Sequence, residues 1–291
     1  MPRLSTCTGR LLETRPGRFA VTDLSHTSSA ESRARPAQAN ILSAGGWTQQ
    51  ALSGKPCHLF EPAADPHPGA LLALHGADSN IFAAGELFTP LLRSHRLRAV
   101  CPYAAGSWWA DRLCPDFDPT LTPERYLLES VLPLFAERWN VKSPLVALIG
   151  IDMGGQAALR LALKRPSTFP IVAALVPQID FHLLHGRGTT LDALYPNREA
   201  ARQDTALLHI HPLNWPRHLF FAADPDDHQW YPGAERFHQK LGALGISHHC
   251  DLETSSRGRP ADYIQNQAAR AIAFVSEALH AEARRLETLS P

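Results

Sequence analysis

The sequence predicts an α/β protein with a mostly parallel sheet and helices on both faces. From residue 47 onward, short apolar segments alternate with longer amphipathic ones, and several of the short segments contain almost no polar residue. Such alternation is typical of strands and helices that follow one another in a parallel sheet. Nearly continuous apolar strands are expected where helices bury both faces of the sheet.

The elements follow one another in a regular order until residue 180. Short apolar runs predict strands at residues 48–52, 57–60, 70–74, 98–101, 145–149, 171–175, 218–222 and 248–252. Longer stretches with helical spacing predict helices at residues 83–93, 123–139, 153–164, 233–244 and 261–285. Residues 180–215 break this order with Gly186, Gly188, Pro196 and Pro212, so we expect a small cap-like insertion there.

The N-terminal 45 residues differ from the rest of the chain. They are rich in Ser, Thr, Arg, Pro and Ala and show no sustained hydrophobic period. A segment of this kind buries too little apolar surface to offset its ordering entropy. We therefore expect a flexible tail at residues 1–45 and one domain over residues 46–291.

Composition excludes several classes of protein. The chain has 291 residues, of which 44% are hydrophobic, and 28 basic residues balance 28 acidic ones. A net charge of zero gives no electrostatic reason to expect nucleic acid or an acidic membrane as partner. There is no apolar run of about 18 residues and no secretory signal, and the five scattered cysteines lack metal-binding spacing. We expect a cytoplasmic protein with free thiols.

The sharpest motif spans residues 146–155, which read VALIGIDMGG and precede a helical pattern. A strand, then Gly-x-Asp-x-Gly, then a helix is the arrangement of a nucleophile elbow. Gly150 and Gly154 lack side chains, so the chain can turn abruptly with Asp152 exposed at the apex. The apex then lies near a helix N-terminus, whose free N–H groups favour negative charge.

Two further motifs follow strand ends. The strand at residues 70–74 leads into His75 and Gly76, where the N–H group of Ala77 is expected to join that of Met153 in an oxyanion hole. After the strand at residues 218–222 comes an acidic cluster, in which Asp227 is the first choice for a catalytic carboxylate. Asp224 and Asp226 are its alternatives, and any one of the three could simply solvate the loop.

These motifs resemble those of the α/β-hydrolases, and within that fold the esterase family that includes S-formylglutathione hydrolase and related acyl-ester hydrolases. The matching stretches are residues 70–76, 150–161 and 220–230. Residues 106–112 also resemble a segment at the pocket mouth of related bacterial esterases, which makes Trp108 and Trp109 candidate pocket residues. The resemblance implies an α/β-hydrolase fold with an eight-stranded, mostly parallel sheet. It also implies a Ser-Asp-His triad in that chain order, carboxylic-ester hydrolysis, and no metal or organic cofactor.

Two positions of that triad hold other residues. Asp152 replaces the serine, and Gly258-Arg259 stands where Gly-His is expected, with no histidine between His249 and His280. A guanidinium stays protonated and cannot relay a proton as an imidazole does. We therefore expect impaired catalysis, with Asp152 and Arg259 forming an ion pair and Asp227 behind them.

Alternatives to this interpretation remain open. The chain could be an active hydrolase that uses Asp152 with His211 or His228, or a non-enzymatic interaction protein that acts through its cap. A small-molecule ester or acyl ligand is the partner that the resemblance implies. The pairs His209/His211 and His182/His185 have zinc-like spacing but no acidic or cysteine partner nearby, so packing or surface roles are favoured over metal binding.

Overall fold

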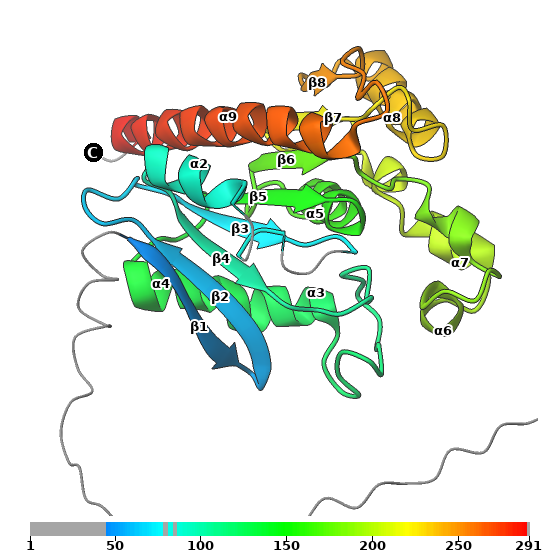
Figure 1. Cartoon of the computed structure of the whole chain (residues 1–291), viewed down its shortest axis with the longest axis horizontal. Helices are drawn as coiled ribbons and strands as arrows, with labels where there is room; N and C mark the ends of the chain where they lie inside the picture. The colour runs from blue at the N-terminus through cyan, green and yellow to red at the C-terminus, as the bar shows by residue number, and fades with distance from the viewer. Residues whose placement is uncertain (1–44, 78–80, 84–85, 290–291) are drawn as a thin grey trace, which may run out of the picture. The chain divides into compact units, whose positions relative to one another are not determined.

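The computed structural model describes residues 45–77, 81–83 and 86–289 (Figure 1). Within these residues the expected sheet is present, with eight strands in the spatial order β1-β2-β4-β3-β5-β6-β7-β8. β2 is antiparallel to both of its neighbours, and the other pairs are parallel. The expected tail at residues 1–45 lies outside the described residues except for its last one.

The strand bounds agree with the sequence pattern to within a few residues. The strands are β1 (Gly46–Leu52), β2 (Lys55–Glu61), β3 (Ala70–Leu74), β4 (Arg98–Pro102), β5 (Val146–Ile151), β6 (Ile171–Leu175), β7 (His218–Ala222) and β8 (His249–Asp251). In the parallel part, Leu74 pairs with Gly150 and Ile151 pairs with Leu175. The carboxyl ends of β3, β5 and β6 therefore meet at one edge of the sheet.

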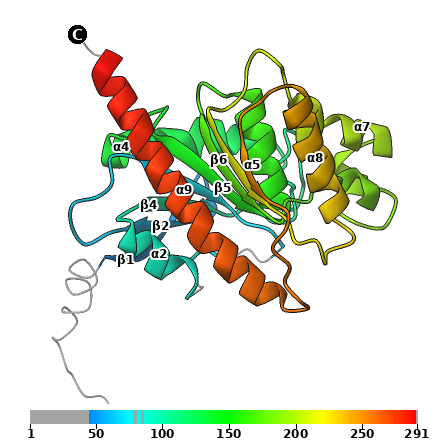
Figure 2. The same cartoon turned by 90° about the horizontal axis from the view of Figure 1, so that it is seen from above.

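Helices cover both faces of the sheet (Figure 2). One face packs against α2 (Phe88–Ser94) and the long α9 (Pro260–Leu289), which crosses the strands. The opposite face packs against α3 (Pro123–Tyr126), η1 (Leu127–Val131), α4 (Leu132–Trp139), α5 (Met153–Lys164) and α8 (Tyr231–Ala243). Among the described residues, no helix has both the length and the apolar character that a membrane crossing requires.

Two expected helices differ from their predicted form. The helix expected at residues 83–93 begins only at Phe88, and part of its predicted start lies outside the described residues. The helix expected at residues 123–139 contains the π-helical turn η1. Pro133 follows directly in the first turn of α4 and has no N–H group for the regular bond to the preceding turn, which explains the local widening.

Strand β5 shows why its sequence is apolar throughout. Val146 and Leu148 belong to the hydrophobic cluster on one face, and Ala147 and Ile149 belong to the cluster on the other. All six of its residues are buried, because both faces of a central parallel strand lie under helices. The strand places Asp152 directly after its last residue, at the edge where the neighbouring strands also end.

The insertion expected at residues 180–215 consists of short helical pieces. They are η2 (Phe181–Leu184), α6 (Leu191–Leu194), α7 (Arg198–Gln203) and η3 (Ala206–His209). Figure 1 shows α6 and α7 beyond the carboxyl ends of β5 and β6. The fully buried Arg160 of α5 fixes this cap: its guanidinium donates to Asp204 at 2.8 Å and to the carbonyl of Trp109 at 2.6 Å.

Candidate functional site

The turn between β5 and α5 places Asp152 in a conformation that residues other than glycine rarely adopt. Its φ is 51° and its ψ is −119°. The turn needs close backbone contact, since a Cβ on Gly150 would lie 2.0 Å from the carbonyl oxygen of Gly154. Backbone bonds hold the apex: the N–H of Asp152 donates to Leu175 at 3.1 Å, and its carbonyl accepts from Gln178 at 3.2 Å. A residue other than glycine that is held in such a conformation stores backbone strain.

The loop after β3 lies directly against this apex. A Cβ on Gly76 would come within 2.4 Å of Oδ2 of Asp152, so only glycine leaves room for the carboxylate. Ala77 and Met153 line one cavity of about 400 Å³ beside the apex. The predicted neighbours of an oxyanion hole are thus brought together.

We call this space the aromatic cavity; its lining includes His75, Ala77, Tyr103, Trp108, Met153 and Thr190. Trp108 belongs to it as expected, and its ring stacks on that of Phe181 at 5.2 Å between centroids. Trp109 does not line it: this side chain is fully buried, and its indole N–H donates to the carbonyl of His75 at 3.1 Å. Trp109 therefore supports the β3 loop from inside the core, and its expected pocket role is wrong.

His75 contributes an imidazole to the lining of the aromatic cavity, and both of its ring nitrogens are hydrogen-bonded to the backbone. Nδ1 lies 2.8 Å from the carbonyl of Gly76, which can only accept, so Nδ1 carries the proton. Nε2 then accepts from the N–H of Ala104 at 3.1 Å. The ring is buried, and these bonds fix it as a neutral structural group that has no ring nitrogen left for proton transfer.

On the other side of the apex lies a second cavity, of about 340 Å³, which we call the acidic cavity. Its lining includes Asp152, Asp224, Asp226, Asp227, Ser256 and Tyr263. Four carboxylates thus face one space, and no imidazole from the described residues lines it. A larger cavity of about 550 Å³ opens between α9 and the strands β7 and β8, and shares no lining residue with these two. The two cavities at the apex are the ones that adjoin the sequence-predicted residues Asp152, Ala77 and Met153.

The three candidate carboxylates after β7 have different surroundings. Asp224 is buried and accepts from the N–H of Ser256 at 3.1 Å, whereas Asp227 accepts from Gln229 and Trp230 within its own turn. Asp226 is exposed and accepts from the hydroxyl of Ser255 at 2.6 Å, a bond that lowers the pKa of this carboxyl. Of the three carboxylates, it is therefore Asp224, the alternative to Asp227, that lies buried against the loop after β8.

The expected Asp152–Arg259 ion pair is not formed. The Arg259 side chain is 75% exposed, and its Nε lies 3.5 Å from Oδ2 of Asp262 within the first turn of α9. Gly258, with a φ of 76°, lines the acidic cavity in its place. Because the chain reverses at this left-handed residue, the next side chain points away from the apex.

Two residues of the site were not singled out from the sequence. Ser256 lines the acidic cavity and is bonded to Asp224. The hydroxyl of Tyr263 is buried in the wall of the same cavity with no hydrogen-bond partner among the described residues. Burial, with the carboxylates of Asp251 and Asp224, raises the pKa of Tyr263, so its hydroxyl stays a hydrogen-bond donor. In the sequence, the one signal for Tyr263 was its position at the start of the last helix, close to the position where the resemblance expects the catalytic histidine.

The remaining histidine candidates lie in local contacts. His209 pairs with Asp204 at 3.4 Å, and His185 contacts the carbonyl of Tyr195 at 2.9 Å. His211 accepts from Leu213 within its own turn at 3.2 Å, and His228 is an exposed residue of the acidic loop. No described histidine of the cap lines the acidic cavity.

Comparison with known families agrees with this geometry. The model of the esterase family, described as "Putative esterase", matches residues 63–249. The chain belongs to this esterase family. No curated protein matches the sequence of this esterase-family chain significantly.

Solved structures confirm the α/β-hydrolase fold of the esterase-family chain. The fluorophosphonate-binding serine hydrolase FphF of Staphylococcus aureus is 14% identical, with a TM-score of 0.62 over 80% of this chain and 98% of the other. An S-formylglutathione hydrolase from Agrobacterium tumefaciens is 16% identical, with a TM-score of 0.62 over 81% and 96%. A ferulic acid esterase is 15% identical, with a TM-score of 0.60 over 80% and 98%.

Proposed function

We propose that this chain binds a small-molecule ester or acyl ligand at the turn apex and hydrolyses it poorly or not at all. The observation that carries the proposal is the composition of the acidic cavity. A carboxylate stands at the nucleophile position, and among the described residues three more carboxylates and no imidazole line the same space. The aromatic cavity, which Ala77 and Met153 line next to the apex, is the place that we assign to the ester carbonyl.

Ester hydrolysis by a serine hydrolase requires a nucleophile and a base that act together. The base takes the proton of the serine hydroxyl and returns it to the leaving group. Asp152 has no such proton to give, and an ester formed on its carboxylate must be cleaved by an activated water. Loss of nucleophile and base together removes about 10⁶ in kcat in a comparable serine hydrolase.

We assign the position of the missing base to Ser256 rather than Arg259. Ser256 lines the acidic cavity with Asp152, and its backbone N–H donates to the buried Asp224 at 3.1 Å, so a side chain at position 256 starts beside that carboxylate. A serine hydroxyl is too weak a base to activate water near neutral pH. The hydroxyl of Tyr263 remains as a donor for a ligand oxygen in this cavity.

A short-chain aryl ester tests the proposal with the purified full-length chain. We expect the unmodified protein and Asp152→Ala to release the aryl alcohol at the same background rate. Binding is measured separately, by equilibrium dialysis of the intact ester. We expect Trp108→Ala to weaken binding, because Trp108 lines the aromatic cavity.

Restoring the triad provides the matched control. We expect Asp152→Ser combined with Ser256→His to raise turnover, and Asp152→Ser combined with Arg259→His to leave it at background, since position 259 faces solvent. Turnover by the unmodified chain that Asp152→Ala abolishes would overturn the proposal. Mass-spectrometric detection of an acyl adduct on Asp152 would favour an active hydrolase instead.

A further inference from the structure

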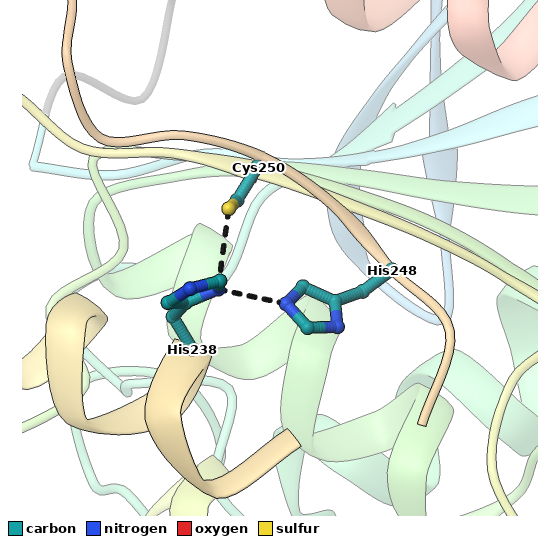
Figure 3. Close-up of side chains that lie close together, drawn as sticks. All are labelled: His238, His248 and Cys250. Atoms are coloured by element: carbon teal, nitrogen blue, oxygen red, sulfur yellow. Dashed lines mark hydrogen bonds between the residues drawn. The ribbon is translucent and has the colours of Figure 1, made fainter. Parts of the chain in front are cut away.

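A cluster of metal-ligating side chains lies apart from the apex, where α8 meets β8 (Figure 3). It consists of His238 on α8, His248 directly before β8, and Cys250 within β8. Nδ1 of His238 lies 2.9 Å from Nε2 of His248 and 3.3 Å from Sγ of Cys250. One ligand atom from each residue falls within 4.8 Å of the other two.

The local fold explains why these residues converge. His248 and Cys250 are two residues apart in extended backbone, so their side chains point to the same side. The chain returns from α8 through a tight turn, in which the N–H of Ile246 donates to Leu241 at 2.9 Å. His249, between the two ligands, contacts Phe274 of α9 on the other side of the strand.

The tautomer of His248 is set by its own backbone. Nδ1 lies 2.8 Å from the carbonyl of Ile246, which can only accept, so Nδ1 carries the proton. The lone pair of Nε2 therefore points toward the other two side chains. Metal-bound histidines commonly have this arrangement, with the second ring nitrogen donating to a carbonyl or carboxylate. Stacking on Phe221, at 5.9 Å between centroids, also orients the ring.

Hydrogen bonds alone do not satisfy both contacts that Nδ1 of His238 makes in the cluster. Nδ1 of His238 must carry a proton to donate to Nε2 of His248, and it must lack one to accept from the Cys250 thiol. It can serve only one of these contacts well. A cation bound among the three atoms, which all lie within 4.8 Å of one another, would accept a lone pair from each of them.

We propose that His238, His248 and Cys250 form a transition-metal site of Zn²⁺ type, with the fourth position open to water. Tetrahedral Zn²⁺ with ordinary bond lengths separates two nitrogen ligands by about 3.3 Å and a nitrogen and a sulfur ligand by about 3.6 Å. The separations of 2.9 Å and 3.3 Å in the structure are a few tenths of an ångström shorter. Small side-chain rotations of the exposed His238 suffice to admit the ion.

The surroundings of the cluster carry negative charge. The carboxylates of Asp251 and Glu253 lie near Cys250, and that of Asp251 is also paired with Arg270. The site shares no residue with the acidic cavity, so it is independent of the proposed ester binding.

Metal titration of the reduced, chelator-treated full-length chain tests the site. We expect one Zn²⁺ per chain, and with Co²⁺ a sulfur-to-metal charge-transfer band together with the intense visible bands of tetrahedral coordination. Cys250→Ser is expected to abolish the charge-transfer band. His238→Ala and His248→Ala are each expected to weaken Zn²⁺ binding by more than the about 10–100-fold that loss of an outer-shell partner causes.

His249→Ala is the matched control, because it removes a histidine from the same strand on the opposite side. We expect it to bind Zn²⁺ as the unmodified chain does. Circular dichroism shows whether each variant keeps the fold, and the Co²⁺ spectrum of the unmodified chain needs no variant at all. A Co²⁺ complex without the sulfur band would overturn the proposal, as would equal Zn²⁺ affinity in the three ligand variants and the control.

Discussion

The backbone strain at Asp152 predicts that glycine at this position stabilises the fold relative to alanine. A residue other than glycine held in a sparsely populated conformation costs of order 1–3 kcal/mol. Glycine removes this cost at a φ of 51°, but the greater freedom of its unfolded chain subtracts about 0.4–1 kcal/mol. Asp152→Gly should therefore exceed Asp152→Ala in free energy of unfolding by about 1–2 kcal/mol.

The comparison between the two variants isolates the strain. Both remove the carboxylate, its contacts and its repulsion by the other acids of the cavity, so these effects cancel in the difference. Urea unfolding gives the free energies, and thermal unfolding should show a Tm about 2–8 °C higher for Asp152→Gly, at about 2–4 °C per kcal/mol for a domain of this size. Equal midpoints for the two variants would show that the turn stores no strain and would refute the reasoning.

Two further predictions concern buried charges. Arg160→Ala leaves the buried carboxylate of Glu124 without one of its cations, so we expect the free energy of unfolding in urea to fall by about 3–5 kcal/mol. Arg165 is exposed and lies 3.9 Å from the same carboxylate, so Arg165→Ala should lower it by under about 1 kcal/mol. Similar losses in the two variants would contradict this prediction. Burial opposes ionisation of Glu282, yet hydrogen bonds from Arg217 and Arg285 lower the pKa of this carboxyl from 4.5 to about 2. Ionised Glu282 therefore stabilises the fold fully above pH 4.5, and this stability is lost as the pH falls toward about 2. Thermal unfolding across this range should show a smaller loss in Glu282→Gln, and identical pH profiles would argue against the shift.

The sequence predicted the central strands best. The bounds of β3, β6 and β7 match the prediction, because these strands are short, almost wholly apolar and buried. The edge strand β8 is only three residues long, although five were expected. Edge strands receive less packing, so an apolar pattern constrains their ends less.

The backbone at the turn could be predicted from the sequence, and side-chain directions could not. The glycines at positions 150 and 154 predict a tight turn with Asp152 at its apex, and the structure has this turn. Arg259 was misplaced because Arg257 and Gly258 both have positive φ, which reverses the chain in a way that spacing does not reveal. Trp109 was misplaced because an aromatic pair gives no indication of which ring enters the core.

The cluster of His238, His248 and Cys250 was not predicted, for a different reason. The histidine pairs considered from the sequence were 182/185 and 209/211, whereas the local signal of the cluster is the His-x-Cys pair at residues 248–250. Its third member, His238, lies ten residues earlier on a helix. Such a site becomes visible only when helix and strand are placed side by side.

The attachment of the cap limits how a ligand can reach the apex. Besides the bond from Arg160 to Asp204, the N–H of Ala206 donates to Gln156 of α5 at 2.8 Å, and Thr190 donates to the carbonyl of Gly106 at 2.6 Å. A cap held at three separate points cannot swing open as a lid without breaking buried polar contacts. For the proposed ligand we therefore expect a route to the apex that needs no movement of the cap as a whole, so the shape of the cavities at rest decides which molecules fit.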